Sequence, residues 1–213
     1  MDELRALTKE ERKTAYNTVF REAFPPEELK PLWRMEEMIA AGEYDFLGLF
    51  RDGTPVGYVC NWRDGAYLLT DYLCVPAERR SGGIGSALVK RMRDAYPAGS
   101  VFIGETEAET GDPARDGLIL RRQAFYRRLG ARYLPYDCAL FGVHYRVFVW
   151  DDGTAEPEEV QRRHDGFYRR SFPPELYAAA VQIPLAPGEQ PYSRRAWSER
   201  PEETDAKSED NAK

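Results

Sequence analysis

The sequence predicts an α+β protein in which helices flank an antiparallel sheet. Two observations carry this prediction: stretches with apolar residues at three-to-four spacing alternate with β-rich runs, and Asp-Gly turns join several of the β-rich runs. The chain has 213 residues, 42% of them hydrophobic and 31% charged, which are values of globular proteins with a real core. The order of the elements places the end of the main domain near Trp150.

The first part of the chain predicts a short strand and two helices ahead of the main sheet. Residues 3–7 alternate as a strand does, and Thr8 followed by Glu11 is the pattern of a capping box, which opens a helix. That helix should end before Pro25. Apolar residues at three-to-four spacing between 29 and 39 predict the second helix.

Three β-rich runs follow and predict an antiparallel meander. They cover residues 44–50, 56–62 and 67–75, and the connections between them carry the Asp-Gly turn signal. Pro76 closes the third strand, and a charged, Gly-rich loop comes next. Apolar residues between 84 and 95 then trace one face of a helix.

The rest of the domain predicts a strand, a loop, a helix and a hairpin. Val101–Ile103 should form a buried strand, and the polar segment 105–116 predicts a loop that is long enough to carry function. We expect a helix over 118–129 and strands over 132–139 and 143–150.

We expect the chain to divide into three parts. The main domain covers residues 1–152, and residues 153–185 predict a helical appendage packed on it. Residues 186–213 are polar, acidic and Pro-containing, which predicts a disordered tail.

Charge and cysteine content exclude several classes of function. The formal net charge of −6 gives no pull toward phosphate backbones, and no apolar run is long enough to cross a bilayer, so we expect neither nucleic acid nor membrane as a partner. Cys60, Cys74 and Cys138 lack the spacing of a metal or redox motif and predict reduced, buried thiols in the cytoplasm. His144 and His164 have no Cys or acidic residue at ligand spacing, so no metal site is expected.

The strongest chemical signal lies between the third strand of the meander and the next helix, at Arg80-x-x-Gly83-x-Gly85. Glycines let successive backbone N–H groups point into one concavity, and the helix N-terminus adds positive potential there. The loop lacks the Gly-Lys-Ser/Thr of a nucleoside triphosphate site and the Gly-x-Gly-x-x-Gly of a dinucleotide site. A simple packing turn would not need Arg79 and Arg80 beside the helix start, so the pattern predicts a pyrophosphate cradle.

Here the sequence resembles the GNAT superfamily of acyl-CoA-dependent N-acetyltransferases, whose core motif is Arg/Gln-x-x-Gly-x-Gly/Ala after a strand. A second match lies at 124–132, where Phe-Tyr-x-x-Leu-Gly resembles the family's segment at the end of its penultimate helix. The resemblance covers about residues 3–150. Many members carry Asn-x-x-Ala before the Tyr, whereas this chain has Ile119 and Arg122 there.

The resemblance implies a GNAT-like fold: a mixed, mostly antiparallel, twisted sheet of about six or seven strands flanked by helices, with the appendage at the C-terminus. It also implies that the third meander strand and the strand at 101–104 splay apart, with the thioester of acetyl-CoA in the gap. Loop amides would bind the pyrophosphate, and a strand edge would pair with the pantetheine arm. The residues implied in binding acetyl-CoA are Leu73, Cys74, Val75, Arg80, Ser81, Gly82, Gly83, Ile84, Gly85 and Ser86.

Two residues are the candidates for catalysis. By the resemblance, Tyr126 lies near the sulfur of CoA and donates a proton to it, although a helix aromatic at this position can also simply pack in the core. For the base we favour Glu105, directly or through water, with Glu107 as its rival. The alternative is that both acids belong to a solvated loop. Cys74 has no His to act as its base, so direct transfer is expected rather than an acyl-enzyme.

The function predicted is N-acetyl transfer from acetyl-CoA, as co-substrate, to an amine of a small molecule or peptide, by direct attack in a ternary complex and without a metal. A small molecule is favoured over a protein as the acceptor. The alternative is a non-catalytic acyl-CoA-binding sensor or scaffold, and acyl chains longer than acetyl stay open. The appendage either covers the acceptor side or pairs two subunits, so the protein is expected to be a monomer or a homodimer.

Overall fold

The computed structural model of the chain describes residues 2–26 and 28–192. Eight strands form one sheet in the order β1-β2-β3-β4-β5-β7-β6-β8. They are β1 (Asp2–Ala6), β2 (Tyr44–Arg51), β3 (Thr54–Asp64), β4 (Tyr67–Cys74), β5 (Val101–Glu107), β6 (Arg132–Leu140), β7 (Val143–Trp150) and β8 (Val181–Leu185). The helices are α1 (Lys9–Ala15), η1 (Tyr16–Phe20), α2 (Arg21–Ala23), α3 (Leu32–Ala40), η2 (Ala77–Arg79), α4 (Ile84–Asp94), α5 (Pro113–Arg128), α6 (Pro157–Ser171) and α7 (Pro174–Ala180).

The sheet is mixed and mostly antiparallel, as predicted. Only β4 and β5 pair in parallel, and every other neighbouring pair is antiparallel. The predicted meander is confirmed as β2, β3 and β4, followed by the Gly-rich loop and α4.

The sheet gains one strand beyond the six or seven expected, because part of the appendage joins it. Residues 181–185, placed in a helical appendage by the sequence analysis, form β8 and pair antiparallel with β6 through Leu140↔Val181 and Asp137↔Leu185. The helical prediction is correct for α6 and α7 only. The β-branched residues Val181 and Ile183 favour a strand, and β8 gives the otherwise open edge of β6 its partner. Most of the predicted disordered tail, residues 193–213, lies outside the described residues.

Helix starts follow local capping. The capping box that opens α1 is confirmed: Glu11 N donates to Thr8 Oγ1 at 3.3 Å, and Thr8 N donates to Glu11 Oε2 at 2.8 Å. Helix α5 begins at Pro113, five residues before the predicted start, because Asp112 Oδ1 accepts a hydrogen bond from Ala114 N at 2.9 Å. Its polar first turn has no apolar periodicity for sequence analysis to detect.

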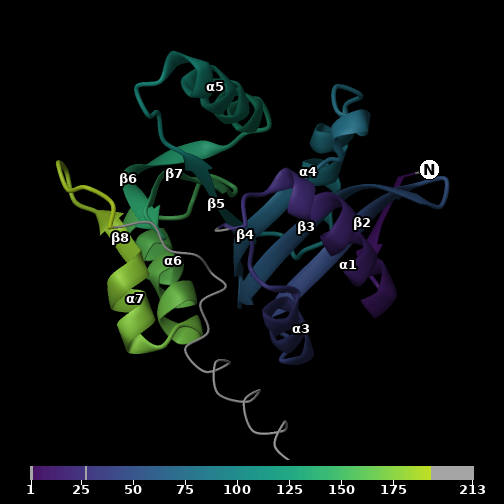
Figure 1. Cartoon of the computed structure of the whole chain (residues 1–213), viewed down its shortest axis with the longest axis horizontal. Helices are drawn as coiled ribbons and strands as arrows, with labels where there is room; N and C mark the ends of the chain where they lie inside the picture. The colour runs from purple at the N-terminus through teal and green to yellow at the C-terminus, as the bar shows by residue number, and fades with distance from the viewer. Residues whose placement is uncertain (1, 27, 193–213) are drawn as a thin grey trace, which may run out of the picture.

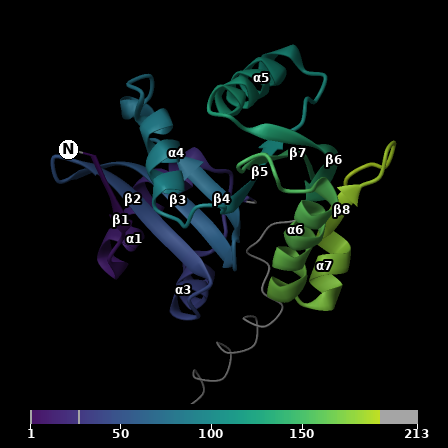
Figure 2. The same ribbon diagram turned by 180° about the vertical axis from the view of Figure 1, so that it is seen from behind.

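Helices cover both faces of the sheet (Figures 1 and 2). One apolar cluster joins α1, η1, α3 and α6 to one face, to which Val101 and Ile103 contribute. A second cluster joins α4, and part of α5, to the opposite face, to which Phe102 contributes. This alternation along β5 is the two-residue period of a strand buried on both sides. Within the described residues, no helix is both long and apolar enough to cross a membrane.

Candidate active site

The sheet opens at its one parallel pair. Pairing between β4 and β5 runs from Tyr67↔Val101 to Thr70↔Gly104 and stops there, although β4 continues to Cys74 and β5 to Glu107. At the same point β4 has a bulge against β3, where Asp71 is the extra residue. A bulge bends its strand and increases the local twist. The two strands therefore diverge beyond Thr70, as the predicted splay requires.

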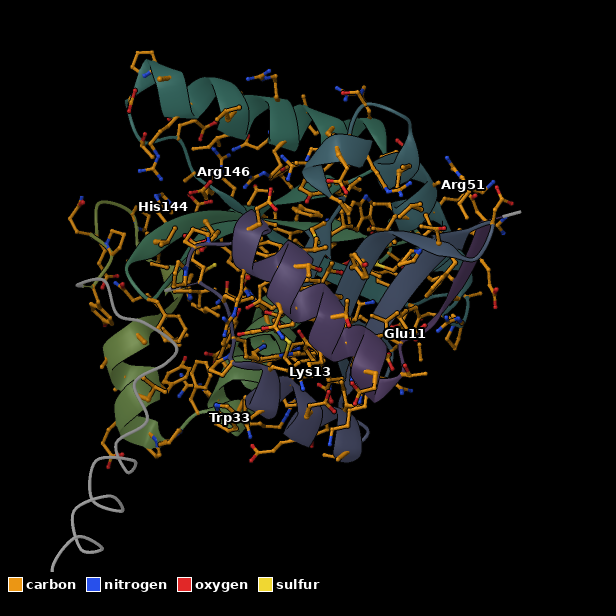
Figure 3. The ribbon with its side chains drawn as sticks, turned by 45° about the vertical axis from the view of Figure 1, so that its right-hand side comes forward. Glu11, Lys13, Trp33, Arg51, His144 and Arg146 are labelled. Carbon is orange, nitrogen blue, oxygen red and sulfur yellow. The ribbon has the colours of Figure 1, made fainter. Side chains whose placement is uncertain are left out.

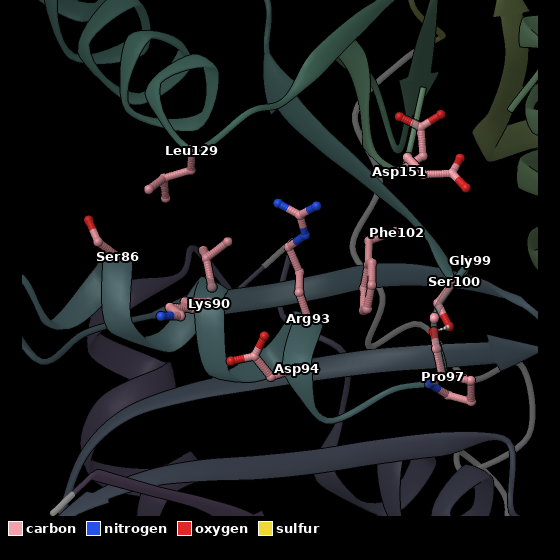
Figure 4. Close-up of a pocket in the computed structure, with 13 residues that line it drawn as sticks. Ser86, Lys90, Arg93, Asp94, Pro97, Gly99, Ser100, Phe102, Leu129 and Asp151 are labelled. Atoms are coloured by element: carbon pink, nitrogen blue, oxygen red, sulfur yellow. Dashed lines mark hydrogen bonds between the residues drawn. The ribbon is translucent and has the colours of Figure 1, made fainter. Parts of the chain in front are cut away.

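A cavity of about 900 Å³ occupies this opening. Eight of the residues predicted for the site line it: Leu73, Cys74, Val75, Arg80, Ser81, Gly85, Glu105 and Tyr126. Four others do not: Ile84 packs in the core, Gly82 and Gly83 lie in the exposed loop, and Ser86 lines a separate cavity of about 330 Å³ beside α4 (Figure 4). The structure thus brings Arg80, Ser81 and Gly85 of the loop before α4, the β4 edge and both candidate catalytic residues to one cavity.

The loop before α4 has the backbone shape of an anion cradle. Gly83, the residue before the helix, has φ +75°, and Ser81 has φ +68°. Arg80 Nε donates to the carbonyl of Val75 at 3.1 Å, which ties the loop to the end of β4. A Cβ at Gly85 would stand 3.1 Å from the ring of Phe125 on α5. The second motif glycine therefore also allows α5 to approach α4 closely.

Tyr126 lies in an aromatic cluster on the cavity wall. Its ring stacks on Phe148 at 4.9 Å between centroids and meets Trp150 edge-on at 5.4 Å. Burial raises the pKa of Tyr126 to about 12. A Cβ on Gly104 would lie only 2.2 Å from the ring of Phe148, so a glycine is needed for that ring to reach Tyr126. The ring of Tyr126 is thus held by its aromatic neighbours, and the residue lines the cavity with its hydroxyl protonated at neutral pH.

Cys74 has the properties of a core thiol. Its side chain is buried, and burial raises its pKa to about 12. A nucleophilic cysteine needs a lowered pKa and a base beside it. Its position therefore agrees with a direct transfer and not with an acyl-enzyme.

Glu105 lies within β5 and not past its end, which corrects the prediction of a loop starting at this residue. Its carboxylate meets two side chains of α6: His164 Nε2 lies 2.6 Å from Oε1, and the Tyr168 hydroxyl donates to the same oxygen at 3.0 Å. Cys138 Sγ lies 4.0 Å away. Sequence analysis missed these partners because β6 and α6 deliver them from far along the chain. Glu105 is a side chain held in a buried network and not part of a solvated loop.

The rival base, Glu107, is already paired. Its carboxylate lies 3.3 Å from Arg115 and 3.4 Å from Arg122, both on α5. It also lines the cavity. These two guanidinium groups compete with a substrate amine for the carboxylate of Glu107. The geometry therefore favours Glu105.

A buried lysine lies behind the bulge. Lys30 is 0% exposed, and its Nζ lies 2.6 Å from Asp71 Oδ2 and 3.9 Å from the centroid of the Trp62 ring. The Tyr44 hydroxyl donates to the same carboxylate oxygen at 2.5 Å. Burial lowers the pKa of Lys30 to about 8. This pair fixes Asp71 at the point where β4 turns away from β5.

His144, the other histidine of the chain, lies outside the cavity. His144 Nε2 lies 2.9 Å from Asp137 Oδ2, and Arg146 Nε lies 3.2 Å from the other oxygen of that carboxylate. His144 and Arg146 are neighbours on β7 (Figure 3), and neither lines the cavity. The His144 side chain is 38% exposed, so this pair belongs to the surface.

Comparisons with known proteins agree with this geometry. The sequence model of the Acetyltransferase (GNAT) family matches residues 9–131. An acetyltransferase described as of the GNAT family from Bacteroides thetaiotaomicron has a similar structure, with TM-score 0.64 and 19% identity over 76% of this chain and 94% of that one. The ribosomal-protein-S18-alanine N-acetyltransferase of Escherichia coli gives TM-score 0.50 and 16% identity over 73% and 97%. NAA60 of Arabidopsis thaliana, in complex with acetyl-CoA, gives TM-score 0.51 and 13% identity over 71% and 99%. No relative of the chain is found among curated proteins.

Proposed function

The chain belongs to the GNAT family of acetyltransferases, and from that premise we propose that it transfers an acetyl group from acetyl-CoA to a primary amine of a small molecule. The observation that carries the proposal is the opening between β4 and β5, where one cavity joins the phosphate loop to Glu105 and Tyr126. An acyl-CoA needs a cradle for its pyrophosphate and a slot for its thioester, and the opening offers both.

The cofactor side of the cavity is supported by local backbone geometry. The segment from Arg80 to Ser86 ends at the N-terminus of α4, where free N–H groups favour an anion. Leu73–Val75 lie beyond the last residue of β4 that pairs with β5, so their edge can pair with the amides of a pantetheine arm. A backbone N–H at this edge would also polarise the thioester carbonyl.

The chemistry assigns one proton transfer to each catalytic residue. The amine nitrogen attacks the carbonyl carbon of the thioester, and the carbon–sulfur bond breaks to leave the amide and a thiolate. Glu105, directly or through a water, accepts the proton that the amine loses, and Tyr126 gives its proton to the sulfur. Because the pKa of Tyr126 is about 12, its hydroxyl keeps this proton at neutral pH until the thiolate forms. Both residues then exchange protons with water.

The acceptor side is lined mainly by aromatic and apolar side chains. Phe24, Phe141, Tyr145 and Tyr168 line the cavity together with Glu105. The E. coli neighbour acts on an alanine of a ribosomal protein, as its name says. In this chain, Tyr168 of α6 and Phe141 of the β6–β7 turn stand over the cavity, and this enclosure supports a small amine as acceptor.

The cysteines support a cytoplasmic location for the reaction. Cys60, Cys74 and Cys138 are free and buried in the described part of the chain. Free thiols of this kind are typical of proteins in a reducing compartment.

The first test is calorimetric titration of the purified protein with CoA and acetyl-CoA. Micromolar binding is expected, followed by release of free thiol when small primary amines are added. Tyr126→Phe should lower kcat by roughly a hundredfold or more while acetyl-CoA binding changes little. No binding to folded protein would refute the proposal, and binding without thiol release from any amine would favour the sensor alternative.

A further inference from the structure

The partners of Glu105 come from outside the segment that matches the family. That match ends at residue 131, whereas α6 begins at Pro157. We call residues 153–192 the C-terminal extension. It supplies both His164 and Tyr168, whose polar atoms lie 2.6 and 3.0 Å from Glu105 Oε1. The candidate base is therefore held by a part of the chain that lies beyond the match to the family model.

The network leaves one carboxylate oxygen for chemistry. Oε1 accepts from His164 and Tyr168, while Oε2 has the Tyr168 hydroxyl at 3.2 Å as its only hydrogen-bond partner among residues 2–26 and 28–192. A hydroxyl has a single proton, so Tyr168 can serve only one of the two oxygens at a time. Glu105 lines the cavity, and its side chain is 13% exposed. Oε2 is thus the oxygen that is available to an amine or to a water.

A second contact orients the histidine ring. His164 is 0% exposed, and its Nδ1 lies 3.2 Å from the hydroxyl of Tyr136 on β6. In a neutral ring one nitrogen carries a proton and the other accepts one. If the Tyr136 hydroxyl donates to Nδ1, the ring proton is on Nε2 and faces Glu105. The ring then offers Glu105 a neutral donor with a fixed direction.

The same atoms could in principle hold a metal ion, since Glu105, Cys138 and His164 place ligand atoms within 4.8 Å of one another. Two ligands of one tetrahedral zinc ion stand about 3.3 Å apart, at roughly 2 Å from the metal. The separation of 2.6 Å between Glu105 Oε1 and His164 Nε2 is shorter and is that of a hydrogen bond. Burial also raises the pKa of Cys138 well above its ordinary value, which disfavours the thiolate that a metal requires. Hydrogen bonding is therefore the better account.

We propose that His164 and Tyr168 are positioning residues for Glu105, so that the C-terminal extension completes the acetyl-transfer site. This inference rests on the proposed function and adds that acetyl transfer depends on the C-terminal extension. The two donors hold Oε1 and aim Oε2 at the acceptor amine. In this proposal the extension acts as a wall of the active site, which favours the first of the two roles left open by the sequence, covering the acceptor side.

The test compares full-length variants at equal fold, as judged by thermal unfolding. His164→Leu should lower kcat for the amine by roughly ten- to a hundredfold, with KM for acetyl-CoA within about twofold. His164→Gln, whose amide can donate to the same oxygen, should recover most of that loss. Tyr168→Phe removes only the hydroxyl and should lower kcat in the same way. His144→Leu is the matched control, because it removes the chain's other His–carboxylate pair, away from the cavity.

A second measurement tests the contact between His164 and Glu105 without depending on turnover, whereas the thiol-release assay tests the proposed function. The chain has two histidines, so nitrogen-15 spectra of their rings are simple to assign with the variants. We expect a slowly exchanging Nε2–H for His164 that changes in Glu105→Gln and is unaffected in His144→Leu. If no amine releases thiol from the wild type, the proposed function has failed, and the inference fails with it even where this signal is present.

Three results would overturn the inference alone, in a protein that does transfer acetyl groups. The first is a His164→Leu variant with the kcat of the wild type. The second is a His164→Gln variant no better than His164→Leu at equal stability. The third is one zinc ion per chain that stays bound through purification of the wild type and is lost in Cys138→Ser. A metal ion, and not the hydrogen bonds of His164 and Tyr168, would then hold Glu105.

Discussion

The buried Lys30–Asp71 pair should make a contribution to protein stability that grows as the pH rises above neutrality. The ammonium is fully buried against Asp71 and the Trp62 ring, and burial lowers its pKa from 10.5 to about 8. In the unfolded chain the pKa returns to the ordinary value, so the unfolded state binds more protons between pH 8 and 10.5. The contribution of Lys30 to stability therefore rises with pH in that window, and the full cost of burying the charged form is present below pH 8.

The magnitude follows from the two pKa values. The interval from about 8 to 10.5, at about 1.4 kcal/mol for each pH unit, gives about 3 kcal/mol over the whole window. Integrated only between pH 7.5 and 9.5, the same values give about 2 kcal/mol. This lower range avoids most ionisation of tyrosines in the unfolded chain. Burial raises the pKa of Cys60, Cys74 and Cys138, and these thiols act in the opposite direction in every variant, so the Lys30 contribution is the difference between the wild type and a variant without the pair.

Urea denaturation followed by tryptophan fluorescence at the two pH values measures the effect. The double variant Lys30→Met/Asp71→Asn removes both charges, so that no unpaired carboxylate is left buried, and it should lose the rise. Lys13→Met changes an exposed lysine of α1 (Figure 3) and should keep it. A wild type and a double variant that gain equally between pH 7.5 and 9.5 would refute the reasoning.

Three further predictions concern the site. Gly104→Ala should destabilise the protein by about 1–3 kcal/mol and lower kcat, because the new Cβ meets the Phe148 ring that supports Tyr126. The control Gly117→Ala, with open space around it, should stabilise α5 by up to about 1 kcal/mol. Equal melting temperatures of the two variants would contradict this. Gly83→Ala should cost about 1–2 kcal/mol and weaken CoA binding in calorimetry, because φ is +75° there, while Gly82→Ala should change stability by less than about 0.5 kcal/mol. The pH profile of kcat should show no alkaline decline up to about pH 10, since the pKa of Tyr126 is about 12 and its donor proton persists. A decline of kcat with a midpoint near pH 9 in the wild type, absent in Tyr126→Phe, would show that this pKa is wrong.

Elements with a local signal could be predicted from the sequence. The capping box of α1, the meander and the loop before α4 all depend on residues close together in the chain, and all three are present. Strand β8 carries only a weak local signal, the β-branched Val181 and Ile183, because a short apolar run after a helix becomes a strand only when a sheet edge is open beside it. The early start of α5 depends on Asp112, which caps the helix without any apolar periodicity.

The candidate site likewise has one part with a local sequence signal and one part without. The cofactor side is encoded in one contiguous motif, and the structure places its arginine and two of its neighbours on the cavity. The partners of Glu105 are 59 and 63 residues away in sequence. No spacing rule connects a strand carboxylate to a histidine on α6, with one helix and two strands between them in the chain. Only the antiparallel return of β6 and β7, followed by α6, brings them together.

The position of β8 in the sheet also affects how the chain can fold while it is being synthesised. β6 lies between β7 and β8 in the sheet, yet β8 is the last of the eight strands to be synthesised. A nascent chain that has released β6 but not β8 presents an unpaired strand edge, which is open to wrong partners. Glu105 likewise leaves the ribosome well before His164 and Tyr168. Completion of the sheet and of the network around Glu105 therefore both wait for the C-terminal extension to be synthesised.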